Sequence, residues 1–445
     1  MKTGRKIIIA ALVSLFLLGL LVRILSLGNP GFEFDTIVTQ HEWGKSVIEM
    51  GFSNFWQNYD KFLDYFPLAV LFDAFIKHIA LLFNSSPETF VLVLKIFNSI
   101  VDLLLILHLA EFAKNHLKKS GVRLWLILCI LWVLPATWFV SAFFGQFDDL
   151  LVLMLVISII NLLTGYKFSW QKWSVFKKIT PEIWAGLILG ISLSLKPQPL
   201  LFLPVLFLYL LQQSSRKQLK PFFNSLLISS ILINIYPFLI NTQRTVYIFA
   251  LLLNRIQLVS NGANTFWTLF PNLKVPQDIL FSLGNINFPV ALIGLIIFIG
   301  VLFASFLLIK KHIQNPEKKR NLPRFRYNLP ALILLAAIIN LAYYLFMMGV
   351  HTRYGQFAVV LGIFPLFYLK NKRMVLVYLS SYILFNLAYS FNQLSIYYYF
   401  YKKHFSINLD NIASNQVLAS LTTFIYLFML IVLITYGRYL RNHQD

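Results

Sequence analysis

The sequence contains one cysteine and few charged residues. Cys129 lies inside an apolar run, so an internal disulfide and a zinc site built from cysteines are both excluded. Only 12% of the 445 residues are charged, whereas 58% are hydrophobic. A soluble domain could not cover so much apolar surface with water-facing side chains. The composition therefore predicts an all-α polytopic membrane protein.

Acidic residues are scarce as well, with 17 Asp and Glu against 38 Lys and Arg. In a soluble protein the net charge of +21 would favour a nucleic-acid partner. In a membrane protein, basic residues concentrate in cytoplasmic loops, and most basic residues of this chain fall on one side of the predicted topology. The basic excess thus reflects orientation, and no nucleic-acid partner is expected. Both termini are predicted to be cytoplasmic, in a multi-pass protein of the plasma (cytoplasmic) membrane.

Twelve apolar runs approach the roughly 20 residues that cross a bilayer. They cover residues 7–27, 90–112, 124–141, 149–164, 182–195, 198–212, 222–240, 288–309, 329–348, 355–369, 374–391 and 415–437. The first run is too long for a signal peptide and lacks a cleavage site, so it is expected to remain as a span. Pro197 and Pro199 interrupt the region 182–212, and 355–369 is short for a straight span. Without an internal repeat or linker, residues 1–445 are treated as one membrane domain.

The segment 68–83 has a different pattern from the spans. Its apolar residues recur at helical spacing, while Asp73, Lys77 and Asn84 fall on the opposite stripe. A helix with a charged stripe lies in the membrane interface or packs over a cavity. We therefore predict an interfacial helix within a long first outer loop, 28–89, and a second long outer loop at 241–287.

Unusual polar sequences gather on the predicted outer side. The first outer loop carries six acidic residues: Glu33, Asp35, Glu42, Glu49, Asp60 and Asp64. Further polar stretches read Phe-Gly-Gln-Phe-Asp-Asp at 144–149, Leu-Lys-Pro-Gln-Pro at 195–199, Ser-Asn-Gly-Ala-Asn-Thr-Phe-Trp at 260–267 and Val-His-Thr-Arg-Tyr-Gly at 350–355. An ordinary solvated surface is the plain alternative for any one of them. Their presence on a single side favours a functional site there.

These residues carry a resemblance to a known family. Asp35, Trp43, Gly51 and then Asp64-Tyr65-Phe66-Pro67 resemble the first outer loop of GT-C superfamily glycosyltransferases. The stretches at 145–148, 195–198, 261–267 and 351–354 are similar, in the same order, to elements of the group related to GPI mannosyltransferase II. Two positions depart from the pattern, because Phe66 replaces a proline and Thr352 stands where that group usually has an acidic residue.

The resemblance implies a reaction and its partners. It implies inverting transfer of a hexose, with mannose indicated by the subgroup, from a polyprenyl phosphate of dolichyl or undecaprenyl type. The acceptor would be a lipid-linked glycan or a protein at the outer membrane face. The sequence alone leaves open a lipid or polysaccharide transporter (a flippase) and a polysaccharide polymerase or ligase. Ionisable residues at one face and the lack of repeat symmetry speak against the transporter.

Roles for single residues follow from the resemblance and from their chemistry. Asp35 is the expected catalytic base, and its alternative role is the N-cap of a helix beginning at Thr36. The predicted substrate-binding residues are Asp64, Tyr65, Gln146, Asp148, Lys196, Asn264, Trp267, His351, Arg353 and Tyr354.

Each binding role has a structural alternative. Arg353 offers phosphate a planar fork but could anchor a span at the interface. Lys196 is a second phosphate candidate or a snorkelling lysine. The aromatic residues Trp43, Trp56, Tyr65 and Trp267 could stack on substrate or belong to an aromatic belt. No acidic or histidine cluster has metal-ligand spacing, so neither a metal nor a cofactor is expected.

Overall fold

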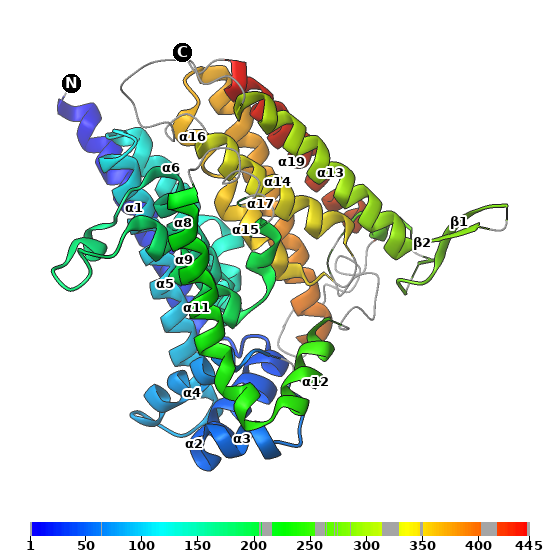
Figure 1. The fold of residues 1–445 in the computed structure, drawn as a ribbon. Coiled ribbons are helices and arrows are strands. Elements are labelled where there is room, and N and C mark those ends of the chain that lie inside the picture. The colour runs from blue at the N-terminus through cyan, green and yellow to red at the C-terminus, as the bar shows by residue number, and fades with distance from the viewer. Residues whose placement is uncertain are drawn as a thin grey trace. The chain divides into compact units, whose positions relative to one another are not determined.

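Regular structure in the described part of this computed structural model is helical, apart from one two-stranded hairpin (Figure 1). The all-α class expected from the sequence is confirmed in that sense. The structure describes residues 2–63, 65–203, 206, 216–253, 263, 265–270, 272–273, 275–284, 286–313, 329–347, 350–401 and 416–442.

The chain divides into two units. Unit 1 comprises Met1–Val133 and Thr137–Asn254, and unit 2 comprises Leu134–Ala136 and Arg255–Asp445. The short helix α7 (Pro135–Trp138) contributes residues to both units. Each unit is described by itself.

Unit 1 contains long apolar helices and a set of shorter helices in the loops. The long ones are α1 (Lys2–Leu27), α5 (Pro87–Asn115), α6 (Val122–Val133), α8 (Asp148–Thr164), α9 (Pro181–Leu195) and α11 (Arg216–Ile240). The shorter ones are the π-helices η1 (Phe34–His41) and η2 (Phe139–Phe143), α2 (Glu42–Met50), α3 (Phe52–Asn58), α4 (Pro67–Leu81), the 3-10 turns η3 (Ser169–Lys172) and η4 (Gln198–Phe202), and α12 (Thr242–Leu253).

Local chemistry explains where several of these helices begin and end. The Ser86 hydroxyl accepts a hydrogen bond from the Thr89 backbone N–H at 3.2 Å, and Pro87 then opens α5. Thr180 and Pro181 start α9 in the same way. Both pairs combine an N-cap oxygen with a proline whose missing N–H would have no intrahelical partner in any case. At the other end of α8, Gly165 adopts the left-handed conformation that terminates the helix.

Buried charged side chains inside the apolar helices make two contacts that hold the helices of unit 1 together. Arg23 of α1 lies 2.8 Å from Asp102 of α5, and the Ser141 hydroxyl donates to the same carboxylate at 2.6 Å. Lys95 of α5 donates to the carbonyl oxygens of Ser26 and Asn29, just before η1. The sequence argument that ionisable residues gather at one face overlooked these three, which are buried within candidate spans. Paired groups of this kind fix how the helices meet.

Helices α9 and α11 approach each other unusually closely. A Cβ atom on Gly186 would lie 2.1 Å from the Ser225 hydroxyl, and one on Gly190 would lie 1.9 Å from the Ser229 hydroxyl. Two glycines four residues apart therefore face two serines four residues apart. Small residues at this spacing let two helix backbones come together in a membrane.

The described residues of unit 2 form four long helices, a broken helix and a hairpin. Its helices are α13 (Val290–Ile313), α14 (Leu329–Phe346), α15 (Gln356–Leu361), α16 (Pro365–Tyr368), α17 (Lys372–Tyr401) and α19 (Gln416–Asn442). Shorter elements are η5 (Phe266–Leu269), η6 (Thr352–Gly355) and the antiparallel strands β1 (Ile279–Leu283) and β2 (Ile286–Pro289). The sequence analysis did not predict the hairpin.

Tyrosines of α17 stabilise the break between α15 and α16. The Tyr382 hydroxyl donates to the Val359 carbonyl oxygen at 2.7 Å, and the Tyr378 hydroxyl donates to that of Gly362 at 2.6 Å. A straight helix over 355–369 is thus not observed, because the helix is interrupted between Leu361 and Pro365. At the Val359 and Gly362 carbonyl oxygens, phenol hydroxyls take the place of backbone N–H donors.

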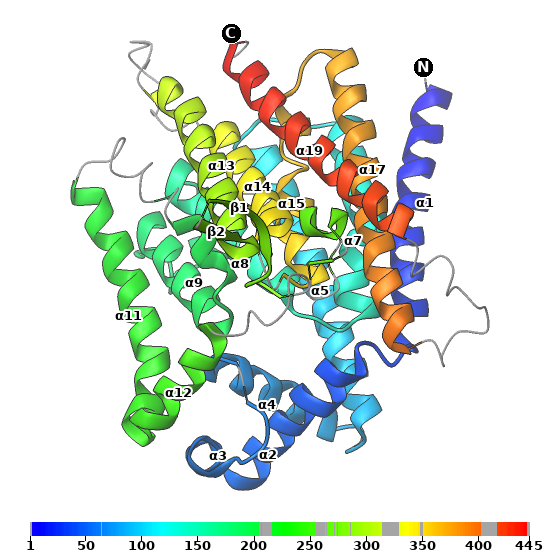
Figure 2. The same ribbon diagram turned by 90° about the vertical axis from the view of Figure 1, so that its right-hand side faces the viewer.

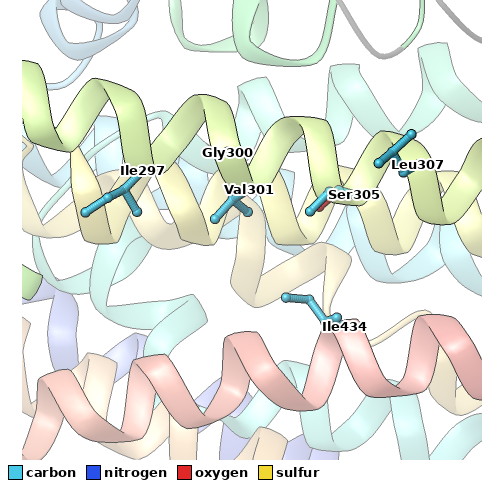
Figure 3. Close-up of a pocket in the computed structure, with 7 residues that line it drawn as sticks. Ile297, Gly300, Val301, Ser305, Leu307 and Ile434 are labelled. Atoms are coloured by element: carbon cyan, nitrogen blue, oxygen red, sulfur yellow. The ribbon is translucent and has the colours of Figure 1, made fainter.

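A groove between α13 and α19 has a volume of about 560 Å³. Ile297, Val301 and Ser305 of α13 and Ile434 of α19 are among its lining residues (Figure 3). The lining is almost wholly apolar, and none of the residues predicted to bind substrate belongs to it.

The number of membrane spans remains a prediction. Among the described residues, five helices are long and apolar enough to cross a membrane: Lys6–Leu27, Pro87–Asn115, Leu219–Ile240, Lys372–Tyr398 and Gln416–Tyr436. The pair Val122–Val133 and Pro135–Phe143, bent by 50°, would make a sixth. Shorter apolar helices occupy Pro181–Leu195, Val290–Ser305 and Leu332–Phe346. The predicted span 198–212 begins as the turn η4, and most of its later part lies outside the described residues.

Candidate active site

The segment predicted as the first outer loop folds around an aromatic core. Trp43, Phe55, Trp56 and Tyr59 are buried together, with Ile248 of α12 packed among them. The Trp43 indole donates to the Phe62 carbonyl oxygen at 2.9 Å. Both tryptophans are almost fully enclosed, so in this structure they serve the packing of the loop.

Helix α12, which begins the second predicted outer loop, completes this core. The Trp56 indole donates to the Thr245 hydroxyl at 2.9 Å, and Arg244 donates to the carbonyl oxygens of Gln57 and Tyr59. Both views show α2, α3, α4 and α12 together at one end of unit 1 (Figures 1 and 2). Part of the first predicted outer loop and the start of the second therefore pack into one core.

Helix α4 turns its charged stripe inward. Asp73 and Lys77 are buried, whereas Phe75 within the helix and Leu82 and Phe83 just beyond its end are more than half exposed. The amphipathic helix predicted over 68–83 is confirmed as a helix. An apolar outer face is what a helix at a membrane interface requires, and that location remains a prediction.

Asp35 lies in the first turn of the π-helix η1. The residue that precedes this helix is Glu33, and it makes no side-chain capping bond. The alternative role of Asp35 as an N-cap is therefore wrong, because the helix begins before it. Wide π turns are rare and often occur at functional sites. The Asp35 side chain is partly exposed, and its Oδ2 accepts a hydrogen bond from Gln146 Nε2 at 3.3 Å.

Close backbone packing brings Asp35 and Gln146 together across 111 residues of sequence. Gln146 follows η2 in a turn where Gly145 has φ +76, a conformation that side chains disfavour. A Cβ atom on Gly145 would lie 3.3 Å from Thr36 of η1. The Phe32 N–H donates to the Phe144 carbonyl oxygen at 3.3 Å. The turn therefore needs glycine both for its dihedral angle and for its contact with η1.

A buried ion pair lies beside this turn. Lys196 Nζ is 3.1 Å from Asp148 Oδ2, and the two side chains are only 4% and 1% exposed. The Lys196 ammonium also lies 4.2 Å from the centre of the Phe147 ring and 5.6 Å from that of Tyr65. Asp148 is the first residue of α8 and Lys196 follows the last residue of α9. Each charge therefore has the sign that the dipole of its own helix end favours.

A second polar contact links η1 to α4. Lys77 Nζ lies 2.9 Å from His41 Nε2 and donates to the Ser85 carbonyl oxygen at 2.7 Å. Burial, and then the Lys77 ammonium, lower the pKa of His41 below its ordinary value. Burial, followed by Lys45, lowers the pKa of Lys77. This contact holds η1 against α4 with the imidazole in its neutral form at neutral pH.

The remaining predicted site residues of the described chain belong to unit 2. Trp267 is 1% exposed, and its indole donates to the Phe346 carbonyl oxygen at 2.9 Å. His351 and Tyr354 stack edge to face with ring centres 5.3 Å apart, and Arg353 between them is 9% exposed. Asn340 holds this turn in place, because it donates to the Tyr354 carbonyl oxygen and accepts from the Ala358 N–H.

The structure thus distributes the predicted residues over the two units. It brings Asp35 next to Gln146, and Asp148 and Tyr65 around Lys196, all within unit 1. Asp64 and Asn264 lie outside the described residues. The binding roles of all of them remain predictions. Within the described ranges, no three His, Cys, Asp or Glu side chains are grouped so that they could hold a metal ion.

The sequence analysis placed Asp73 on the charged stripe of 68–83 but assigned it no functional role. Asp73 is fully buried in α4, and burial raises its pKa well above the ordinary value, an effect that Lys196 partly offsets. The charged stripe of 68–83 is the sequence signal from which the burial of Asp73 could have been predicted. If a helix does not span the membrane, its charged stripe faces either water or the interior of the protein.

The comparison with protein families assigns the chain to a family. The sequence matches the model of glycosyltransferase family 87 over residues 65–321, which is more than half of the chain. Tyr65, Gln146, Asp148 and Lys196 fall inside this segment, whereas Asp35 and the stretch 351–354 fall outside it. No curated protein matches the sequence. The resemblance to membrane glycosyltransferases is confirmed at the level of a family, and the GPI mannosyltransferase II-related subgroup remains a prediction. With this match and its long apolar helices, the protein is a membrane glycosyltransferase and belongs to glycosyltransferase family 87.

Proposed function

We propose that the protein transfers a hexose, with mannose the first sugar to test, from a polyprenyl phosphate to an acceptor hydroxyl at the outer membrane face. The transfer would invert the anomeric carbon. The observation that carries this proposal is the hydrogen bond between Asp35 and Gln146, beside the buried Lys196–Asp148 pair. The carrier would be of dolichyl or undecaprenyl type, and the acceptor a lipid-linked glycan or a protein, as the resemblance implies.

Asp35 has the surroundings that a general base requires. Its carboxylate is partly exposed, so an acceptor hydroxyl can reach it, while the Gln146 amide holds one oxygen in place. A carboxylate oxygen that is positioned in this way can accept the proton of an acceptor hydroxyl. The chain that leads into η1 is held in place as well, because Lys95 donates hydrogen bonds to the carbonyl oxygens of Ser26 and Asn29.

The departing phosphate needs cationic or hydrogen-bonding partners. In unit 1 the candidate is Lys196, whose ammonium is held at the end of α9 by Asp148 and the ring of Phe147. In unit 2 the candidate is Arg353, whose planar guanidinium can bind two phosphate oxygens at once. Each role is proposed from the residue's own chemistry and motif.

Family membership favours the enzyme over the transporter that the sequence left open. A purified preparation in lipid nanodiscs, supplied with a panel of polyprenyl phosphate sugars and glycan acceptors, should release polyprenyl phosphate from at least one donor. Release without any inverted glycoside, or no release from any donor in the panel, would count against the proposed reaction. Growth of a repeating polymer would identify a polymerase.

Replacement of the base tests the assignment of Asp35. Asp35→Asn keeps the shape of the side chain and removes its proton affinity, so turnover should fall by about a hundredfold or more with donor binding largely retained. Asp60→Asn is the matched control, since Asp60 is an exposed carboxylate of the same loop and should leave turnover unchanged. Turnover of Asp35→Asn within a few fold of the unmodified enzyme, with Asp148→Asn inactive although folded, would move the base to Asp148.

A further inference from the structure

The connection between α8 and α9, residues 165–180, is a folded loop that takes no part in the proposed reaction. It includes the turn η3 and belongs entirely to unit 1. Figure 1 shows this loop projecting from the ends of α8 and α9. It contains four lysines and no acidic residue. A stretch with so much charge of one sign either faces open water or binds an anionic partner.

Hydrogen bonds attach the loop to the C-terminal part of α5. Glu111 of α5 accepts from the Tyr166 hydroxyl at 2.9 Å and from the Ser169 backbone N–H at 2.8 Å. The Trp170 indole donates to His108 Nε2 at 3.0 Å. Helix α5 is long and apolar enough to cross a membrane, and Glu111 lies in its last two turns. We therefore expect the loop at the membrane surface, because it is fixed to the end of a candidate span.

The aromatic residues of the loop have two different environments. The rings of Trp170 and Phe176 contact Trp184 of α9 edge to face, with ring centres 5.0 and 5.4 Å apart. The Trp173 side chain, between them in the sequence, is 65% exposed, and Val175 is 79% exposed. Two rings thus pack the loop onto α9, while a tryptophan and a valine remain uncovered.

Further hydrogen bonds hold the loop in one conformation. Lys167 Nζ donates to the Lys177 carbonyl oxygen at 2.9 Å, which joins the two sides of the loop. At its base, the buried side-chain amides of Gln171 and Asn161 donate to each other, both at 2.9 Å. A surface that is ordered before binding loses little conformational entropy when a partner arrives.

Lysines accompany the uncovered apolar side chains. Lys172, Lys177 and Lys178 are exposed, and they lie on both sides of Trp173 and Val175 in the sequence. Tryptophan prefers the boundary between water and lipid, since its ring is apolar and its N–H needs a polar partner. Lysines beside apolar side chains are typical of surfaces that bind anionic lipids. The loop therefore has both features that such a bilayer recognises.

We propose that residues 165–180 form a membrane-binding surface that selects anionic lipids. Lys172, Lys177 and Lys178 contact the phosphate headgroups, and Trp173 and Val175 enter the region of the acyl chains. The partner is the membrane in which the protein is embedded, because the loop is attached to the end of α5. The proposal depends neither on the reaction nor on which side of the membrane the loop lies.

The test places a fluorescent label on the loop and a quencher in the lipid. Val175→Cys in the Cys129→Ala background carries a bimane label, and the protein is placed in phosphatidylcholine nanodiscs. One lipid in ten has brominated acyl chains, either as phosphatidylglycerol or as phosphatidylcholine. Both lipids should quench the label. The phosphatidylglycerol should be enriched at the label by about fivefold or more, since one lysine near an anionic surface has an effect of this size.

Two matched proteins serve as controls. With Lys172→Gln, Lys177→Gln and Lys178→Gln added, the two brominated lipids should quench the label equally, and molar salt should have the same effect on the unmodified loop. These side chains and Val175 are exposed, so the substitutions should not disturb the fold. A label at Ser120→Cys, an exposed position beside Lys118 and Lys119 in the connection between α5 and α6, should be quenched much less.

Each part of the proposal has an outcome that refutes it. A label at position 175 that neither lipid quenches would show that the loop faces water or an acidic protein. Equal quenching by the two lipids, or enrichment that persists in the triple lysine variant, would refute the selection of anionic lipids by these lysines. Equal quenching at positions 175 and 120 would show that the loop has no special contact with the bilayer. Turnover is not measured, so the result is independent of the proposed function.

Discussion

Removal of one partner of the Lys196–Asp148 pair is the most direct test of the candidate site in unit 1. The atoms are 3.1 Å apart and both side chains are almost fully buried. At an effective dielectric constant of about 20, two unit charges at this distance attract by roughly 5 kcal/mol, and the lost hydration of both groups opposes most of that attraction. The intact pair is thus worth little net stability, whereas either charge alone would be buried without its partner.

We therefore expect Lys196→Met to lower the free energy of unfolding by about 3 to 5 kcal/mol. Asp148→Asn should also destabilise the protein, because it leaves the ammonium buried with a neutral amide. The double variant should be less destabilised than the sum of the two single variants, by about 2 to 3 kcal/mol. Methionine retains the length of the lysine stem, so the packing against Phe147 and Tyr65 is largely preserved.

Unfolding in mixed micelles, followed by tryptophan fluorescence, gives the four free energies of this double-mutant cycle. A matched exposed pair is available in Lys45 and Glu49, which lie 4.0 Å apart on α2 and should show coupling well below 1 kcal/mol. Strictly additive effects for Lys196→Met and Asp148→Asn would show that the two side chains are energetically independent. The electrostatic reasoning about this site would then fail.

Two further predictions concern unit 2 and the topology. Arg353→Ala should weaken donor binding more than Arg353→Lys, by an amount equal to roughly 1.5 to 3 kcal/mol for a lost charge-assisted hydrogen bond, as measured by donor titration. Unchanged affinity in both variants would leave Arg353 as an interfacial anchor. In a Cys129→Ala background, Ser53→Cys and Ser86→Cys should both react with an impermeant thiol reagent from outside. Reaction of the two thiols from opposite sides would disprove the predicted first outer loop.

The sequence predicted the parts of this fold that depend on local pattern. Helix α1 ends at Leu27 as expected, and α5, at Pro87–Asn115, exceeds the predicted span 90–112 by three residues at each end. Capping residues and prolines define such helix ends, and both can be recognised in the sequence. The charged stripe of 68–83 similarly predicted an amphipathic helix, since its period depends only on helix geometry.

The candidate site depended on contacts that no local pattern encodes. The π-helix η1 and the hydrogen bond from Gln146 to Asp35 arise where Gly145 lets two distant turns approach. The pairing of Lys196 with Asp148 requires α8 and α9 to lie side by side, and the sequence supplied only their separate motifs. Burial of Asp73 is likewise a product of packing between α2 and α4. Such tertiary effects override what each segment would do alone.

The aromatic core of the first outer loop has a consequence for the synthesis of the protein. Trp56 finds its hydrogen-bond partner in Thr245, 189 residues later in the chain. At translation rates of about 5 to 20 residues per second, that partner follows roughly 10 to 40 s after the loop itself. During this interval Phe55 and Trp56 are not yet covered by α12, so the aromatic core of the loop is incomplete. The loop that carries the proposed base therefore completes its core only after α12 has been synthesised. A chain truncated before α12 would leave Phe55 and Trp56 exposed and prone to aggregation.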